Sequence, residues 1–251
     1  MARDALLPRP WSRPPLRHSA TRIGVRVMSF DRLAPHYRWM EWVLAGDKLQ
    51  RCRRAFLNII PSPEEALLVG EGNGRFLSEL IRAHPRTRIT CVDASAAMLE
   101  RARQRVSAQA SLRSAGVEFI HADALEWSPP PGRFNLIVTH FFLDCFRPEQ
   151  LGPLLARLAR AATPEADWLV ADFSEPAAGW KRWRARVILL AMYLFFRRVT
   201  DLPATAITSP DAWLADSGFV LRERRSYDWG LLRSDLWTRR TTEGIVHPLT
   251  S

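Results

Sequence analysis

The 251-residue sequence has few cysteines and few lysines. Cys52, Cys91 and Cys145 lie far apart and form no CxxC pair, so neither a zinc site nor a disulfide framework has support, and we expect a reducing cytoplasm. Only two of the 36 basic residues are lysine. This bias reflects codon usage more than binding.

The net charge of +10 is unevenly distributed. Residues 1–27 hold six arginines against one acid, are rich in proline and contain no apolar run of the secretory type. We therefore expect residues 1–28 to be a disordered basic tail or an over-extended gene start. The remainder is only mildly basic, so we expect no nucleic-acid partner.

Short apolar strands alternate with helical segments in the middle of the chain, after a helical region at 30–60. Such alternation predicts a parallel sheet covered on both faces. The strands are expected at 66–69, 88–93, 117–123, 134–140 and 166–173, with helices at 74–85, 95–110 and 148–162. Two further strands, 218–227 and 231–240, are separated by only three residues and predict an antiparallel hairpin. The fold class is therefore α/β, a Rossmann-like doubly wound sheet that is mostly parallel and ends in a hairpin.

A glycine-rich loop, LLVGEGNGRFL at residues 67–77, follows the first strand. Its glycines have the spacing GxGxG, with Arg75 where the dinucleotide fingerprint GxGxxG has its third glycine. No Lys-Ser or Lys-Thr follows, which excludes a P-loop. The loop alone indicates either a ligand at a helix N-terminus or a turn that needs positive φ angles.

Two acids extend this signal to the next strands. Asp93 is 19 residues beyond Gly74, at the end of the second strand, where a carboxylate can accept hydrogen bonds from ribose hydroxyls. Asp123 ends the third predicted strand, on the side of an adenine amino group. Ligands of doubly wound sheets bind beyond the carboxyl ends of the strands, so these residues should converge on one crevice.

With these motifs the sequence resembles the class I S-adenosylmethionine-dependent methyltransferases, and FDRLAPHYRWMEW resembles the N-terminal cover helix of their ubiquinone/menaquinone-type branch. The resemblance implies a methyltransferase domain at 29–245, with cover helices at 30–60 and an apolar cap helix inserted at 179–203. It implies S-adenosylmethionine as cofactor. The implied cofactor-binding residues are Tyr37, Gly70, Glu71, Gly72, Asn73, Gly74, Asp93, Ala94, Met98, Asp123, Ala124 and His140.

The glycine motif departs from the family pattern at one position. The family commonly has an acid two residues before the first glycine, where this chain has Leu68. Glu71 lies inside the loop and is the candidate to replace it.

Two residues after the fourth strand are candidates for catalysis. His140 could contact the cofactor, act as a general base, or be a hydrogen-bonded histidine at a strand end. Asp144 could be a base or a turn residue. The NPPY-like motif of nucleobase and amide methylation is absent.

Segment 179–203 contains an uninterrupted apolar run of ten residues, Val187 to Phe196, whereas a bilayer span needs about 20. We expect a buried cap helix that shapes the acceptor site. Peripheral contact of 180–198 with an anionic membrane is the alternative, since tryptophans and arginines flank the run.

These observations predict a methyltransferase that acts on a small, lipophilic or aromatic acceptor. The acceptor's identity and the oligomeric state are not predicted. An RNA methyltransferase and a catalytically silent adenosylmethionine-binding protein remain alternatives.

Overall fold

The structure is a computed structural model and describes residues 46–109, 116–199 and 207–239. Tyr37 and the basic tail lie outside these residues. The strands are β1 (Glu65–Val69), β2 (Arg88–Asp93), β3 (Val117–His121), β4 (Phe134–His140), β5 (Ala162–Phe173), β6 (Phe219–Tyr227) and β7 (Leu232–Arg239). The helices are α2 (Gly46–Arg53), α3 (Arg75–Ala83), α4 (Ala96–Ser107), α5 (Pro148–Ala161), α6 (Gly179–Val199) and α7 (Asp211–Asp216), with short 3-10 turns η3 (Leu143–Cys145) and η4 (Asp228–Gly230).

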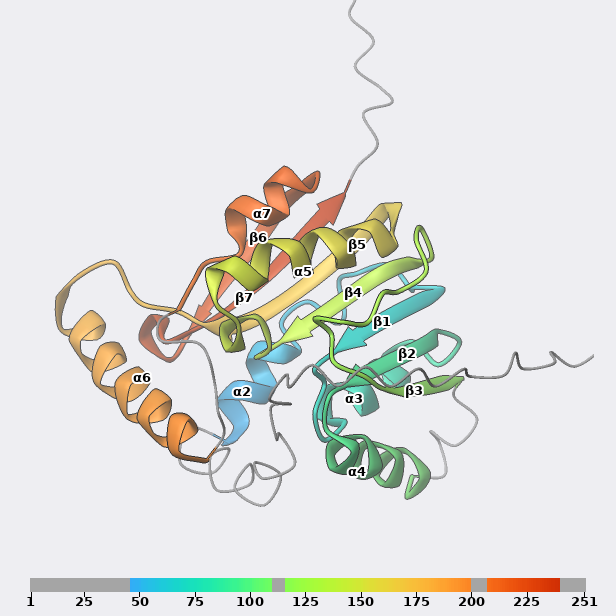
Figure 1. Cartoon of the computed structure of the whole chain (residues 1–251), viewed down its shortest axis with the longest axis horizontal. Helices are drawn as coiled ribbons and strands as arrows, with labels where there is room; N and C mark the ends of the chain where they lie inside the picture. The colour runs from blue at the N-terminus through green and yellow to red at the C-terminus, as the bar shows by residue number, and fades with distance from the viewer. Residues whose placement is uncertain (1–45, 110–115, 200–206, 240–251) are drawn as a thin grey trace, which may run out of the picture.

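The seven strands form one sheet in the order β3-β2-β1-β4-β5-β7-β6 (Figure 1). β1 to β5 pair in parallel, whereas β7 runs antiparallel to both β5 and β6. The predicted doubly wound sheet with a C-terminal antiparallel hairpin is confirmed.

The central strands β1, β4 and β5 are mostly buried because both faces of the sheet are covered there, whereas the edge strands β3 and β6 are partly exposed. In β1, Ala66 and Leu68 pack with α3 and α4 on one face, and Leu67 and Val69 pack with α5 and α7 on the other. The sheet therefore separates two layers of core. α6 extends away from both layers at the left of Figure 1.

The direction of β7 brings two regions to the same edge of the sheet. Its first residue, Leu232, pairs with Phe173, the last residue of β5. The turn between β6 and β7 therefore lies at the carboxyl ends of the parallel strands, where the glycine loop and Asp93 also lie. This edge carries the candidate site.

Two local predictions were wrong in detail. The helical region predicted up to residue 60 ends at Arg53 in α2, and residues 54–60 form turns; Pro61 disfavours helix in the residue before it. Asp123 does not end β3, which stops at His121, but lies in the turn that follows.

Candidate active site

The glycine loop turns sharply between β1 and α3. Gly70, Gly72 and Gly74 all have positive φ angles, 68°, 69° and 77°, a region that residues with side chains rarely adopt. The turn also requires space, because a Cβ added to Gly70 would lie 2.2 Å from Phe142 Cδ2. The backbone of the loop is thus open for close approach.

Glu71 holds the first turn of α3. Its Oε1 accepts hydrogen bonds from the N–H groups of Phe76 (2.8 Å) and Leu77 (2.9 Å), and these replace the side-chain cap that Gly74 cannot supply. Burial raises the pKa of Glu71 to about 7, against the opposing charge of Arg53. Leu68 is fully buried in the core beside α3. Glu71 therefore provides a carboxyl group inside the loop, whereas position 68 provides an apolar core side chain.

Asp93 ties the loop to the end of β2. Its Oδ2 accepts a hydrogen bond from Gly72 N (3.0 Å), and its Oδ1 accepts one from Ser95 N (2.8 Å). Asp93 therefore supports the glycine loop from the end of β2, the position at which a ribose-binding carboxylate was expected.

The other predicted cofactor residues surround this loop. Asn73 O accepts a hydrogen bond from Arg105 of α4, and Ala94 O accepts one from His121. Met98 is buried in the first turn of α4, which Ser95 caps. In the turn after β3, Asp123 is exposed and accepts a hydrogen bond from Leu125 N, while Ala124 is buried.

His140 ends β4 and is buried on the α3 side of the sheet. Its ring contacts Phe76 edge-on, with 4.5 Å between ring centroids. Within the described part of the chain neither ring nitrogen has a hydrogen-bond partner. Burial, assisted by the charge of Arg53, lowers its pKa well below the usual value. His140 is therefore a neutral side chain whose two polar atoms lack protein partners.

Arg53, at the end of α2, was not singled out from the sequence. It is buried; its guanidinium lies 5.0 Å from the ring centroid of Phe141, and its charge lowers the pKa values of Glu71 and His140. Phe141 has a φ of 52°, a rare conformation for a residue with a bulky side chain. Arg53 lies in a run with Arg51 and Arg54 at the end of α2, so the sequence does not show which of these arginines is buried.

A pair of buried carboxyl groups lies near this loop. Asp144, in η3, and Asp172, near the end of β5, are hydrogen-bonded to each other through their side chains. Burial raises the pKa of Asp144 to about 6 and that of Asp172 further above its usual value. The two carboxyl groups therefore share one proton, and the pair carries a single negative charge at neutral pH.

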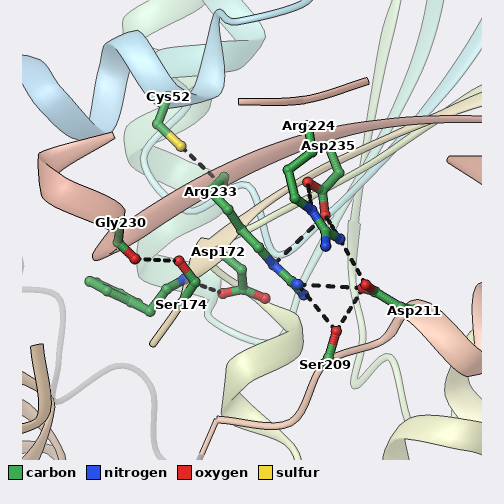
Figure 2. Close-up of polar contacts among 10 residues, drawn as sticks. Cys52, Asp172, Ser174, Ser209, Asp211, Arg224, Gly230, Arg233 and Asp235 are labelled. Atoms are coloured by element: carbon green, nitrogen blue, oxygen red, sulfur yellow. Dashed lines mark hydrogen bonds and ion pairs between the residues drawn. The ribbon is translucent and has the colours of Figure 1, made fainter. Parts of the chain in front are cut away.

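Arg233 of β7 is the cross-strand partner of Asp172, and its charge opposes the effect of burial on the pKa of that acid. Figure 2 shows its guanidinium pointing toward Ser209 and Asp211, with Nη1 3.1 Å from Ser209 Oγ and 3.4 Å from Asp211 Oδ1. Asp235, which is fully buried, lies 3.7 Å from Arg233 Nε. These contacts hold the Arg233 side chain in place next to Asp172.

Comparison with known proteins agrees with this geometry. A family model described as a methyltransferase domain matches residues 66–165. The demethylmenaquinone methyltransferase of Deinococcus radiodurans is 28% identical over 170 residues, which are 67% of this chain and 68% of that protein.

Two solved structures share the fold. The mitomycin 7-O-methyltransferase MmcR aligns with a TM-score of 0.61 and 20% identity, over 84% of this chain and 60% of that one. The 1,6-didemethyltoxoflavin-N1-methyltransferase of Burkholderia thailandensis, solved with S-adenosylhomocysteine, aligns with a TM-score of 0.58 and 16% identity, over 84% and 88%.

The strand order, the glycine loop and the acid at the end of β2 define a nucleoside-binding doubly wound protein. Together with the match at residues 66–165 they show that the chain contains a methyltransferase domain with the strand order and glycine loop of the class I S-adenosylmethionine-dependent enzymes. Its cofactor is S-adenosylmethionine. The residues present fit this group, since the glycine loop precedes the N-terminus of α3 and, among the described residues, the buried nitrogens of His140 have no hydrogen-bond partner.

Proposed function

We propose that the protein methylates a heteroatom of a small, apolar or aromatic acceptor, with Asp144 as the general base. The observation that carries the proposal is the hydrogen bond between Asp144 and Asp172, which places one buried carboxylate with a pKa of about 6 near the glycine loop. A base is most effective when its pKa is close to the working pH. The apolar, aromatic class of the acceptor, though not the methylated atom, is supported by the demethylmenaquinone methyltransferase to which the chain is similar.

The segment after β4 brings donor and acceptor sides together. Phe142 packs against Gly70 of the cofactor loop, and Asp144 follows two residues later. The charge of Asp93 is also near enough to raise the pKa of Cys145, the residue after Asp144. Asp144 is therefore close to the loop that holds the methyl donor.

The bound cofactor would supply a methyl group on a sulfonium, so that the acceptor heteroatom bonds to the methyl carbon as the C–S bond breaks and S-adenosylhomocysteine leaves. Asp144 accepts the proton that the acceptor heteroatom loses, and Asp172 donates a hydrogen bond that orients Asp144. Phe141, Phe142 and Phe173 offer apolar surface for the acceptor, and alignment with exclusion of water supplies much of the rate.

His140 fits a binding role better than a catalytic one. Its low pKa makes it a weak base, and it lies on the α3 side of the sheet, whereas Asp144 and Asp172 lie with Arg233 on the α7 side. We assign its ring nitrogens to hydrogen bonds with the bound cofactor. Arg53 beside it positions the ring through Phe141.

Incubation with methyl-labelled S-adenosylmethionine and fractionated cell extract tests this function. We expect label in a small organic fraction, lost with Asp144→Asn and kept with Asp167→Asn. Asp167 is a matched control because it is a buried acid in the first half of β5, bonded to Thr238. Label in RNA would support the RNA alternative, and cofactor binding without transfer would support the silent one.

A further inference from the structure

Helix α6 exposes a continuous apolar stripe. Trp180, Trp183, Val187, Leu190 and Leu194 are spaced by three or four residues and share one helix face. Their exposed fractions range from 47% to 71%. The opposite face of α6 is buried, since Ala185, Leu189 and Met192 pack against the end of β5 and the start of β7. The sequence-based expectation of a buried cap helix therefore describes only half of α6.

A sixth exposed side chain adjoins the stripe. Trp229, in the turn between β6 and β7, is 57% exposed and its ring centroid lies 5.8 Å from that of Trp180. Trp229 and the preceding Asp228 have φ angles of 54° and 48°, which cost about 1–2 kcal/mol per residue. Strain of this kind persists only where surrounding contacts maintain it.

Ion pairs hold this strained turn against α2 and α6. Asp228 accepts hydrogen bonds from Lys48 Nζ (2.7 Å) and Arg184 Nη2 (3.1 Å), and both cations also lie over the ring of Trp229. The tryptophan is thus fixed in an exposed position beside the start of the stripe.

The charged residues of α6 itself are all basic. α6 contains six basic residues and no acid: Lys181, Arg182, Arg184, Arg186, Arg197 and Arg198. Among the described side chains, Glu175 pairs with Arg182 and Arg186, and Asp228 pairs with Arg184. In a pairing of two copies along this stripe, Arg184 and Arg186 would take the flanking positions, where like charges repel.

We propose that this stripe, with Trp229, docks the protein on the surface of an anionic lipid bilayer. Tryptophans suit the interface between headgroups and acyl chains, apolar side chains enter it, and flanking cations attract acidic lipids. Within the described ranges no helix is long and apolar enough to cross the bilayer, so α6 would lie in the interface.

The stripe and Trp229 lie close to the candidate active site. The start of α6 and the β6–β7 turn lie at the same sheet edge as Asp172, so docking would hold that edge close to the membrane and let a lipophilic acceptor enter from it. This consequence rests on the proposed function, whereas the docking itself does not.

Co-sedimentation of the full chain with vesicles tests the proposal. We expect at least tenfold more binding to phosphatidylcholine vesicles that contain phosphatidylglycerol than to phosphatidylcholine alone, and less binding at high salt. A Trp183→Glu/Leu190→Glu variant should lose at least tenfold of the bound fraction. Both side chains are exposed, so the melting temperature should be unchanged.

Val220→Glu is the matched control. Val220 is a 66% exposed apolar residue near the start of β6, at the opposite edge of the sheet. The Val220→Glu variant should bind vesicles as well as the wild type does. The proposal is overturned if the wild type does not bind, if variant and control behave alike, or if the stripe variant instead converts a dimer to a monomer. Cofactor affinity of the stripe variant should be unchanged; failure of the wild type to bind cofactor would refute the proposed function and not the docking.

Discussion

The carboxyl groups of Asp144 and Asp172 are hydrogen-bonded to each other, although one lies in a turn after β4 and the other near the end of β5. Two acids in such contact share one proton at neutral pH, because two buried like charges cannot both be stable. The pair therefore offers a single carboxylate, which we assign to Asp144, the residue whose pKa lies near the pH of the cell.

The first prediction concerns the pH dependence of methyl transfer. kcat/KM should rise with pH and reach half its plateau near pH 6, since Asp144 must lose its proton to act as base. Asp144→Asn should lower kcat by roughly 10²- to 10⁴-fold, the usual contribution of a general base. A flat profile through pH 6, or an active Asp144→Asn, would refute the assignment.

Asp172 should behave as a positioning residue. Asp172→Asn keeps a donor for Asp144 and should retain most activity, whereas Asp172→Ala removes it and should lower kcat and shift the acid limb of the profile. Both variants should keep their cofactor affinity. If the Asn and Ala variants were equally impaired, the hydrogen bond would not be the reason for the effect.

The second prediction concerns stability and Glu71. Its pKa is raised by folding, so the folded state binds the proton more tightly and its stability falls as pH rises from about 4.5 to 7. Glu71→Gln keeps an acceptor for the helix but does not titrate. The variant should therefore gain up to about 3 kcal/mol relative to wild type across this range.

Urea unfolding of both proteins without cofactor, at pH 4.5 and pH 8, measures this difference. Comparing the two proteins cancels the titration of His140 and of the Asp144–Asp172 pair. A difference in unfolding free energy that does not change with pH would show that Glu71 titrates normally.

The sequence predicted the fold because each strand and helix carries its own local signal. It also predicted that the glycine loop and Asp93 meet, because the carboxyl ends of parallel strands share one edge. An acid close to a helix N-terminus can cap it, so a contact of Glu71 with α3 was foreseeable. Whether Glu71 supplies the carboxyl group that is absent at position 68 depended on the backbone of the loop.

The rest depends on contacts between distant segments. Asp172 shares the strand-end position that identified Asp93, so the same rule could have found it. Its pairing with Asp144 depends on the register of β4 against β5 and on the turn after β4, which no local pattern fixes. For α6 the sequence left a buried cap helix and a surface contact of 180–198 as alternatives, because the apolar run from Val187 to Phe196 does not show which face of the helix packs on the protein.

The third prediction isolates the close approach of Phe142 to the glycine loop. Gly132→Ala is the control, since Gly132 has a φ of 62° and nothing within 4 Å of an added Cβ. It should cost about 1–2 kcal/mol for conformation alone. Gly70→Ala, with a φ of 68° and Phe142 in the way, should cost about 1–3 kcal/mol more.

Thermal unfolding of the two alanine variants measures the gap between them. Adding Phe142→Ala to Gly70→Ala should remove most of the extra cost, since the clash is with that ring. Equal costs for Gly70→Ala and Gly132→Ala would show that the ring moves aside freely.

The most direct test of the account is calorimetric titration of S-adenosylmethionine into the wild type and Asp93→Ala. The wild type should bind one cofactor per chain, and loss of the hydrogen bonds to a charged group should weaken binding by about 1.5–3 kcal/mol, or roughly 10- to 150-fold. Asp123→Ala, at an exposed acid in the turn after β3, should weaken binding less. Absence of binding to the wild type, or an unchanged affinity of Asp93→Ala, would contradict the cofactor site described above.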